Sequence, residues 1–213
     1  MPIDFYYGSG SPYAWRVWLT LEHKRLPYTL KMVSFSEGDL QKAEFLALNP
    51  RHKVPVIVDG EFSLFESAAI VDYLEEAYPE RPVLPCSVQQ RAVARRMIRE
   101  ADQYLAAALE ILVDEILFTA EEKRDESRLQ RGRDAMLAEL GRFESLLTGD
   151  WFTEDVGAVD YTVYPLIALV IRIEKRIPSL GIEAALGRRL RDWLGQMEAL
   201  PYFPTTYPPH WKG

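Results

Sequence analysis

The sequence predicts an α/β domain followed by an all-helical domain, and three observations support this fold class. β-like and helical segments fill the first 80 residues in the order β-α-β-α-β-β-α. A proline-rich stretch over 80–85 then interrupts the chain, and helical periodicity dominates after it. Such an order predicts a four-stranded mixed sheet with helices on both faces. We therefore expect domains at 1–80 and 88–213, joined by a linker at 81–87.

The chain opens with a strand and a capped helix. Ile3-Asp4-Phe5-Tyr6-Tyr7 is a β-like run that ends at Gly8-Ser9-Gly10. Ser11-Pro12 favours a helix start, because serine caps helix N-termini and proline suits the first helical position. The segments that follow are a helix to His23, a strand over 28–35 and a short helix over 38–49.

The segment Val54-Pro55-Val56-Ile57-Val58-Asp59-Gly60 predicts a strand and a tight turn. An unbroken apolar run suits a strand covered on both faces, and Asp-Gly is a strong hairpin signal. Pro55 cannot donate a hydrogen bond, so it belongs at the first residue of the strand. This leaves the N–H and C=O of Val54 free to pair with a peptide laid alongside.

A second short strand should lead into a helix that begins at Glu66-Ser67. Helix N-termini carry free N–H groups and partial positive charge, which suits a carboxylate ligand. From these residues alone, an ordinary hairpin and a serine-capped helix remain the simpler interpretation.

The second half reads as helices throughout. Helical periodicity covers 88–118, 127–147, 161–177 and 182–200. The stretch over 161–177 is apolar almost all round and should be the buried centre, with Pro165 near its first turn. The tail over 201–213 shows no clear element.

Composition excludes several classes of function. The 213 residues carry a formal net charge of −7, which argues against general nucleic-acid binding. The one cysteine, Cys86, excludes an intramolecular disulfide and a cysteine metal site, and the three histidines are too scattered to form a metal site. The N-terminus lacks signal-peptide features, and the longest apolar run, 161–171, is too short to span a membrane. We expect a cytoplasmic protein that uses no metal.

The chain resembles the cytosolic glutathione transferase superfamily over essentially its whole length. The most specific match runs from Asn-Pro-Arg-His-Lys-Val-Pro-Val-Ile-Val-Asp-Gly at 49–60 to Phe-Glu-Ser-Ala-Ala-Ile-Val-Asp-Tyr-Leu at 65–74. Ser11-Pro12-Tyr13-Ala14-Trp15-Arg16-Val17 looks like the serine-type classes: theta, phi, zeta and delta. The resemblance implies a thioredoxin-like first domain, a cis Val54–Pro55 bond and a homodimer. It also implies an enzyme of detoxification, a glutathione transferase.

Glutathione binding, as the resemblance implies it, needs three kinds of contact. Ser67 suits the γ-glutamyl carboxylate and Glu66 suits its ammonium group. Val54, next to Pro55, can pair with the cysteinyl backbone. His52 and Lys53 stand where the family often contacts the glycyl carboxylate, although solvated loop polarity explains them equally well.

The glutathione thiol must also become a thiolate, and a free thiol with a pKa of about 8.5 is mostly protonated at neutral pH. Ser11 can supply both a hydroxyl hydrogen bond and a helix N-terminus, and the resemblance favours it as the activating residue. Ser9 and Tyr7 remain alternatives. Arg16 is expected to brace the site, to pair with the second domain or to be a surface charge.

The electrophile should be hydrophobic. Its possible contacts, each equally compatible with plain packing, are Tyr13, Tyr104, Ala108, Tyr164 and Trp211. Gly157-Ala158-Val159-Asp160 matches the family's N-capping box except for glycine at its first position, and is expected to be a folding element.

Three alternative functions remain open at this stage: glutathione-dependent isomerisation, peroxide reduction on the same thiolate, and a non-catalytic binding or scaffold module. Tyr13 stands where the zeta pattern has cysteine, which weighs against the isomerase. No cysteine lies near the first helix, which weighs against omega-type thiol transfer.

Overall fold

A computed structural model describes residues 1–211 and divides the chain into two compact units. Unit 1 comprises Met1–Leu84 and the chain from Leu200 onward, and unit 2 is Pro85–Ala199. The break after Leu84 falls inside the linker expected at 81–87. The expected domain 88–213, however, placed the C-terminal residues with the helices, whereas the structure groups them with unit 1. Residues 212 and 213 of that expected domain lie outside the described residues.

A four-stranded mixed sheet is the centre of unit 1, with the strand order β2-β1-β3-β4. Strand β1 pairs in parallel with β2 and antiparallel with β3, and β3 forms an antiparallel hairpin with β4. The strands are β1 (Ile3–Tyr7), β2 (Tyr28–Met32), β3 (Val56–Asp59) and β4 (Phe62–Phe65). Val56 and Ile57 are fully buried, as expected of an apolar strand covered on both faces.

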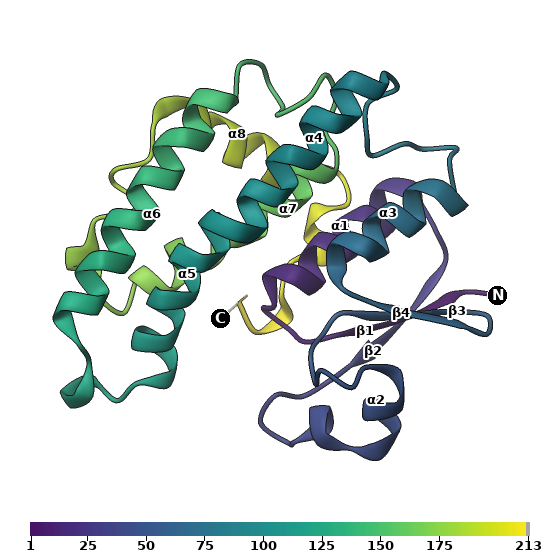
Figure 1. The fold of residues 1–213 in the computed structure, drawn as a ribbon, viewed down its shortest axis with the longest axis horizontal. Coiled ribbons are helices and arrows are strands. Elements are labelled where there is room, and N and C mark those ends of the chain that lie inside the picture. Colours follow the sequence, from purple (N-terminus) through teal and green to yellow (C-terminus); the bar gives the residue numbers. More distant parts are fainter. Residues whose placement is uncertain (212–213) are drawn as a thin grey trace. The chain divides into compact units, whose positions relative to one another are not determined.

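Helices cover both faces of this sheet, which confirms the predicted α/β fold. Helices α1 (Pro12–Lys24) and α3 (Ser67–Ala77) lie on one face, and the short α2 (Ala43–Leu48) lies on the other, after the single 3₁₀ turn η1 (Asp39–Gln41) (Figure 1). The expected helix over 38–49 is therefore two short pieces.

The strand register brings three connecting segments to one end of the sheet. Tyr6 of β1 is paired with Val56 of β3, and Val56 is paired with Phe65 of β4. Because neighbouring strands run in opposite directions here, the end of β1, the start of β3 and the end of β4 coincide. The segments 8–11, 52–55 and 66–67 therefore all leave the sheet at this end.

A buried ion pair closes unit 1 away from that end. Lys24 Nζ lies 2.9 Å from Glu75 Oε2, and both side chains are almost fully buried. The Glu75 carboxylate also accepts hydrogen bonds from the backbone N–H groups of Val83 and Leu84. Because these bonds satisfy the charge, its burial is tolerated and the start of the linker is fixed to α3.

Unit 2 is built from five longer helices. They are α4 (Val88–Glu100), α5 (Ala106–Val113), α6 (Glu126–Leu146), α7 (Ala158–Glu174) and α8 (Arg188–Glu198). The expected helix over 88–118 is one helical run in which the π-helical turns η2 (Ala101–Leu105) and η3 (Asp114–Phe118) follow α4 and α5. The expected helix over 182–200 begins only at Arg188, because turns occupy 182–185.

Helix α7 is buried over most of its surface, as its sequence predicts. Pro165 does not lie in its first turn, because the helix begins at Ala158 and Pro165 is inside it. No helix of the described chain combines the length and the apolar character that a membrane span requires.

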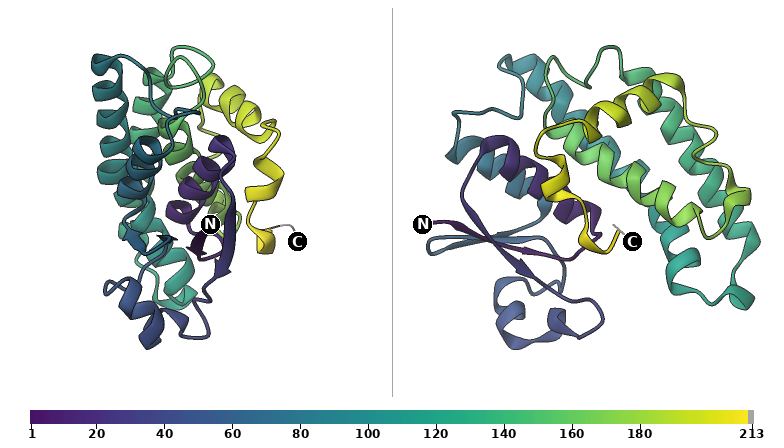
Figure 2. Two further views of the ribbon diagram at one scale, coloured as in Figure 1. Left: turned by 90° about the vertical axis from the view of Figure 1, so that its right-hand side faces the viewer. Right: turned by 180° about the vertical axis from the view of Figure 1, so that it is seen from behind.

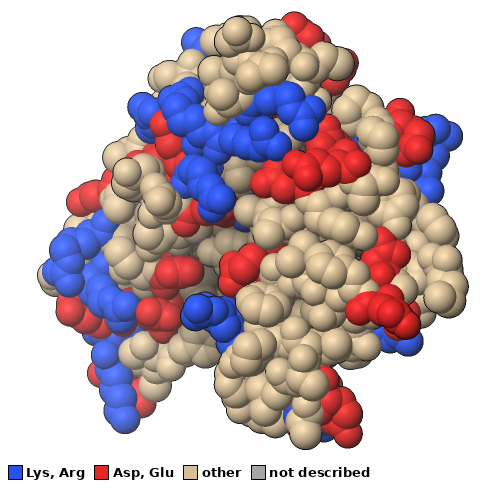
Figure 3. Space-filling model, turned by 45° about the vertical axis from the view of Figure 1, so that its right-hand side comes forward, with Lys and Arg blue, Asp and Glu red and all other residues tan. Residues whose placement is uncertain are grey.

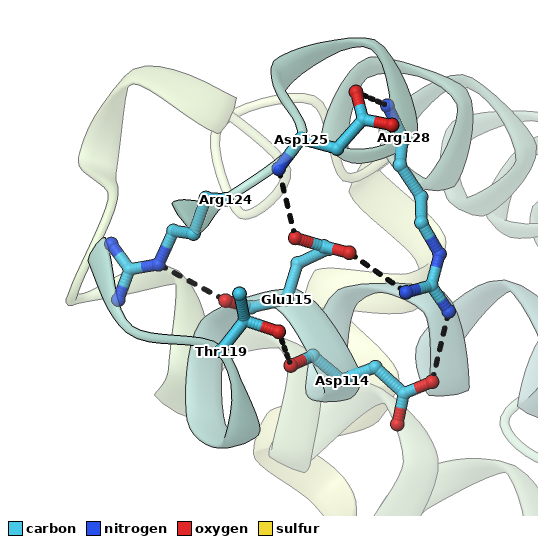
Figure 4. Close-up of polar contacts among 6 residues, drawn as sticks. All are labelled: Asp114, Glu115, Thr119, Arg124, Asp125 and Arg128. Atoms are coloured by element: carbon cyan, nitrogen blue, oxygen red, sulfur yellow. Dashed lines mark hydrogen bonds and ion pairs between the residues drawn. The ribbon is translucent and has the colours of Figure 1, made fainter. Parts of the chain in front are cut away.

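A polar cluster holds the connection between η3 and α6 in place. Buried Glu115 accepts hydrogen bonds from the backbone N–H of Asp125 at 3.0 Å and from the Arg128 guanidinium at 2.7 Å. Arg124 donates to the backbone carbonyl of Glu115, as Figure 4 shows. Asp125 itself caps α6 by accepting from the N–H of Arg128. The carboxylates of this cluster therefore serve the fold.

The C-terminal arm, defined here as Leu200–Trp211, contains the short helix α9 (Phe203–Thr206) and the 3₁₀ turn η6 (Pro209–Trp211). It runs alongside α1 in the views of Figure 2. Trp15 of α1 donates its indole N–H to Thr206 Oγ1 at 2.9 Å, and both side chains are buried. This contact explains why the arm belongs to unit 1, and the sequence could not reveal it because the partners lie 191 positions apart.

Candidate functional site

Ser11 caps the first helix, as predicted. Its backbone is extended, with φ −69° and ψ 120°, and its Oγ accepts a hydrogen bond from the N–H of Ala14 at 3.3 Å. Its own N–H donates to the carbonyl of Gly8, which closes the turn before the helix. Within residues 1–211, the structure records no acceptor for the Ser11 hydroxyl proton. The hydroxyl therefore keeps a proton that it can donate to an anion.

The two alternative activating residues are placed differently from Ser11. Ser9 Oγ lies 2.6 Å from Nδ1 of His210, so its hydroxyl is already in a hydrogen bond. Tyr7 is 7% exposed and its ring packs against those of Phe5 and Trp18. Burial raises the pKa of the Tyr7 phenol, which makes its anion less accessible.

The loop before β3 is shaped by Asn49, the last residue of the segment expected to be helical over 38–49. Asn49 is 2% exposed; its amide nitrogen donates to the carbonyl of Lys53 at 2.7 Å, and its amide oxygen accepts from the N–H of Arg51 at 2.9 Å. Asparagine side chains in turns often form hydrogen bonds to the nearby backbone, and this tendency is the sequence signal that could have identified the role of Asn49.

His52 and Val54 carry unused polar groups in this loop. His52 has a φ of +56°, and its buried Nδ1 has no hydrogen-bond partner among the described residues. The Val54–Pro55 peptide bond is cis. No backbone hydrogen bond of Val54 is recorded in the described chain, so its N–H and C=O are open to an added peptide. Lys53 is exposed next to them.

The start of α3 is also open. Glu66 is the residue before the helix, and its side chain does not cap the helix. Its φ of +71° is unfavourable for a residue with a Cβ and costs about 1–3 kcal/mol. Ser67, the first helical residue, is 8% exposed. The first N–H groups of α3 therefore have no side-chain cap from the residue before the helix, which suits an anion.

The sheet register brings together all the predicted site residues of unit 1. Ser11 follows β1, the segment 52–55 precedes β3, and the segment 66–67 follows β4, at the same end of the sheet. Arg16 is not a surface charge: it is 2% exposed and its guanidinium lies 5.8 Å from the centre of the Tyr13 ring.

The residues expected to contact an electrophile do not share one environment. Ala108 and Tyr164 are buried in unit 2, and Tyr164 donates to Glu198 and packs on Trp193, which makes it a core residue. Tyr104 is 56% exposed.

The candidate site offers hydroxyl, backbone amide, carboxylate, imidazole and ammonium groups. Within the part of the chain that the structure describes, no three His, Cys, Asp or Glu side chains are grouped as metal ligands. On the face drawn in Figure 3, basic and acidic side chains lie beside one another.

Comparison with known proteins identifies relatives over the full chain. A family model described as glutathione S-transferase, N-terminal domain, matches residues 5–82. The crystal structure of a glutathione S-transferase from the Antarctic clam Laternula elliptica superposes with a TM-score of 0.83 at 30% identity, covering 100% of this chain and 94% of that one.

Two curated relatives extend the comparison. Glutathione S-transferase A of Pleuronectes platessa is 28% identical over 216 residues, which is 96% of this chain and 91% of the relative. A probable maleylacetoacetate isomerase 2 of Drosophila melanogaster is 34% identical over 128 residues, or 59% of this chain and 55% of the relative.

Proposed function

This chain belongs to the cytosolic glutathione transferase superfamily, and we propose that it is a glutathione transferase that activates the thiol of glutathione for attack on a hydrophobic electrophile. The observation that supports this proposal is the meeting of three open segments at one end of the sheet. Each segment offers polar groups that the protein itself leaves unused.

Each part of the tripeptide has a matching group. The γ-glutamyl carboxylate accepts from Ser67 and the first N–H groups of α3, and the Glu66 carboxylate pairs with the ammonium group. The cysteinyl backbone adds to the edge at Val54, beside Pro55, in the manner of an extra strand. The glycyl carboxylate pairs with the Lys53 ammonium group and accepts a hydrogen bond from His52.

Ser11 then acts on the sulfur. The S–H bond breaks and its proton passes to solvent, while the Ser11 hydroxyl donates a hydrogen bond to the thiolate. The N-terminus of α1 adds partial positive charge, and both effects favour the anion over the thiol. The thiolate attacks the electrophile, a C–S bond forms, and the leaving group departs with its electron pair.

Kinetic measurements on Ser11→Ala with a chlorodinitroaromatic electrophile test this assignment. We expect kcat/KM to fall by roughly 100-fold, because a hydrogen bond to a developing anion is lost. Ser87→Ala is the matched control, since Ser87 caps α4 in the same way, accepting from the N–H of Gln90 at 3.2 Å. Both variants should lose about 1 kcal/mol of stability through the cap, but only Ser11→Ala should lose activity.

Unchanged turnover in Ser11→Ala would remove Ser11 from the mechanism. Glutathione binding by the wild-type chain without turnover of any electrophile in a panel would instead favour a non-catalytic binding module.

A second candidate, glutathione-dependent isomerisation, is supported by the relative named as a probable maleylacetoacetate isomerase. Tyr13 in place of the cysteine of the zeta pattern argues against it. An assay with a cis-configured diketo acid, in which turnover is measured as loss of ultraviolet absorbance, would distinguish isomerase activity from transfer to an electrophile.

Family membership also supports three further parts of the proposal: a homodimer, a cytoplasmic location and a role in detoxification. Light scattering on the purified chain tests the first directly, since a mass near 24.5 kDa would contradict a dimer.

A further inference from the structure

The turn that presents Ser11 is flexible by composition but closely packed in the structure. Two glycines flank Ser9, and Gly10 has a φ of +84°, a conformation that glycine adopts without strain. A Cβ at Gly10 would lie 2.8 Å from His210 Cε1 and 3.2 Å from Trp211 Nε1. The end of the C-terminal arm therefore lies directly against this turn.

The arm is fixed at its other end by buried contacts with α1. Thr206 is fully buried and accepts the indole proton of Trp15. The Trp15 ring also contacts those of Phe203, Tyr207 and Trp211, at centroid distances of 5.8, 5.9 and 5.4 Å. Because Trp15 is only four residues after Ser11, the anchor and the active-site turn belong to one rigid helix start.

A polar contact joins the arm to the turn. His210 Nδ1 lies 2.6 Å from Ser9 Oγ, a distance typical of a strong hydrogen bond. Ser9 is in turn two residues before Ser11, whose N–H closes the turn on Gly8. His210 therefore restricts the one segment whose two glycines would otherwise let the Ser11 hydroxyl move.

We propose that His210 is a positioning residue for the Ser11 hydroxyl: through its hydrogen bond to Ser9, the C-terminal arm holds the turn over Gly8–Gly10 in the geometry that activates the thiol. The assignment rests on the proposed function. It adds to the site a residue from the far end of the chain, 201 positions from its partner.

His210→Ala is the first test, because His210 is exposed and its loss should leave the fold intact. We expect the pKa of the thiol of bound glutathione, followed by thiolate absorbance, to rise by about 0.5 to 1, and kcat/KM to fall about five- to tenfold. The affinity for S-methylglutathione should not change, since this analogue has no thiol to activate. Thr205→Ala, an exposed position on the same arm, is the matched control and should behave as wild type.

Two further variants separate positioning from a merely structural role. His210→Asn keeps a nitrogen or oxygen at the place of Nδ1 and should recover most of the activity and of the thiol pKa. Ser9→Ala should match His210→Ala, and the double variant should be no worse than either, because both remove the same hydrogen bond.

Several results would overturn the proposal. These are a thiol pKa in His210→Ala equal to that of wild type, an equal loss in S-methylglutathione affinity, or no recovery in His210→Asn. A far larger loss in Ser9→Ala than in His210→Ala would show that Ser9 itself activates the thiol. If the wild-type chain neither binds glutathione nor lowers its thiol pKa, the proposed function fails first and this assignment fails with it.

Discussion

Buried polar groups are used differently at Asp160 in unit 2 and at the open end of the sheet in unit 1. In unit 2, Asp160 is fully buried and its carboxylate accepts from the N–H groups of Gly157 and Phe152 and from the indole of Trp193. At the open end of the sheet in unit 1, the backbone N–H and C=O of Val54 and the Nδ1 of His52 have no recorded hydrogen-bond partner among the described residues. Saturated groups hold a fold together, whereas unsaturated groups at one place indicate a ligand that completes them.

Backbone strain, in the form of positive φ angles, is also found at the open end of the sheet. Within residues 1–211, three non-glycine residues have a positive φ: His52 and Glu66 lie in the segments of the proposed glutathione site, and Arg25 ends α1. A positive φ persists only where the surrounding structure or a ligand compensates for it. The comparison therefore makes opposite predictions for substitutions at these two places: lost stability at Asp160 and lost affinity at the open end of the sheet.

The largest expected effect is on Asp160. Asp160→Ala leaves three buried N–H donors unsatisfied and should lower the free energy of unfolding by about 3–5 kcal/mol. Glutathione affinity measured well below the unfolding transition should not change. Asp155→Ala, at an exposed position nearby, should change stability by no more than about 0.5 kcal/mol. If affinity fell with stability in Asp160→Ala, the proposed division between the units would be wrong.

The pH dependence of stability tests the same residue. Burial raises the pKa of Asp160 from 3.8 to about 6, although its three hydrogen bonds favour the carboxylate. The folded chain therefore binds more protons than the unfolded chain between these values, so the contribution of this group is present at low pH and lost as the pH rises through about 6. The full contribution of Asp160 ionisation to the free energy of unfolding is about 3 kcal/mol.

Denaturant unfolding of wild type and Asp160→Asn, from about pH 4 to about pH 7, measures this contribution. The amide does not titrate, so the stability advantage of wild type over the variant should shrink by about 2.4 kcal/mol between these pH values, because the unfolded carboxyl is already more than half ionised at about pH 4. An advantage that stays constant or grows would show that the hydrogen bonds, and not burial, control the carboxyl group.

A smaller effect is expected at the start of α3. Ser67→Ala should weaken glutathione binding by roughly 10-fold or more, because a hydrogen bond to a carboxylate is worth about 1.5–3 kcal/mol. Stability should be nearly unchanged, since Ser67 contributes no side-chain cap to the helix. Titration calorimetry compares the glutathione affinity of Ser67→Ala with that of the control variant Ser63→Ala, in which an exposed serine of β4 is replaced. Equal affinities in the two variants would exclude Ser67 from the site.

The smallest effect should come from releasing backbone strain. His52→Gly relieves a positive φ and should raise stability by up to about 1 kcal/mol, while glutathione affinity falls about fivefold. Arg25→Gly is the control, because Arg25 has a φ of +54° at the other end of α1 and should gain stability without losing affinity. Thermal unfolding measures the stability of both variants, and calorimetry measures their affinity for glutathione. If His52→Gly binds glutathione as well as wild type, the positive φ of His52 does not contribute to binding.

Local sequence signals predicted most of this fold. The apolar run at Val56, the Asp-Gly turn and the Ser11-Pro12 helix start each act within a few residues, so periodicity and turn chemistry could identify them. The helix expected over 161–177 was placed too late, although the N-capping box recognised at 157–160 marks the start of α7. The two π-helical turns were missed because packing within unit 2 sets them.

The residues of the candidate site were chosen from similar local signals. Ser11 and Glu66-Ser67 were indicated by helix-start chemistry together with the family resemblance. The role of Asn49, the positive φ of Glu66 and the hydrogen bond of His210 to Ser9 were not, because they depend on backbone geometry or on contacts between distant parts of the chain.

The most direct test of the central claim is the pKa of the thiol of glutathione bound to this protein, measured by thiolate absorbance against pH. We predict a pKa at least one unit below that of the free thiol, which is about 8.5, and a return toward the free value in Ser11→Ala but not in Ser87→Ala. A bound thiol that ionises like the free one, or that is lowered equally in both variants, would contradict it.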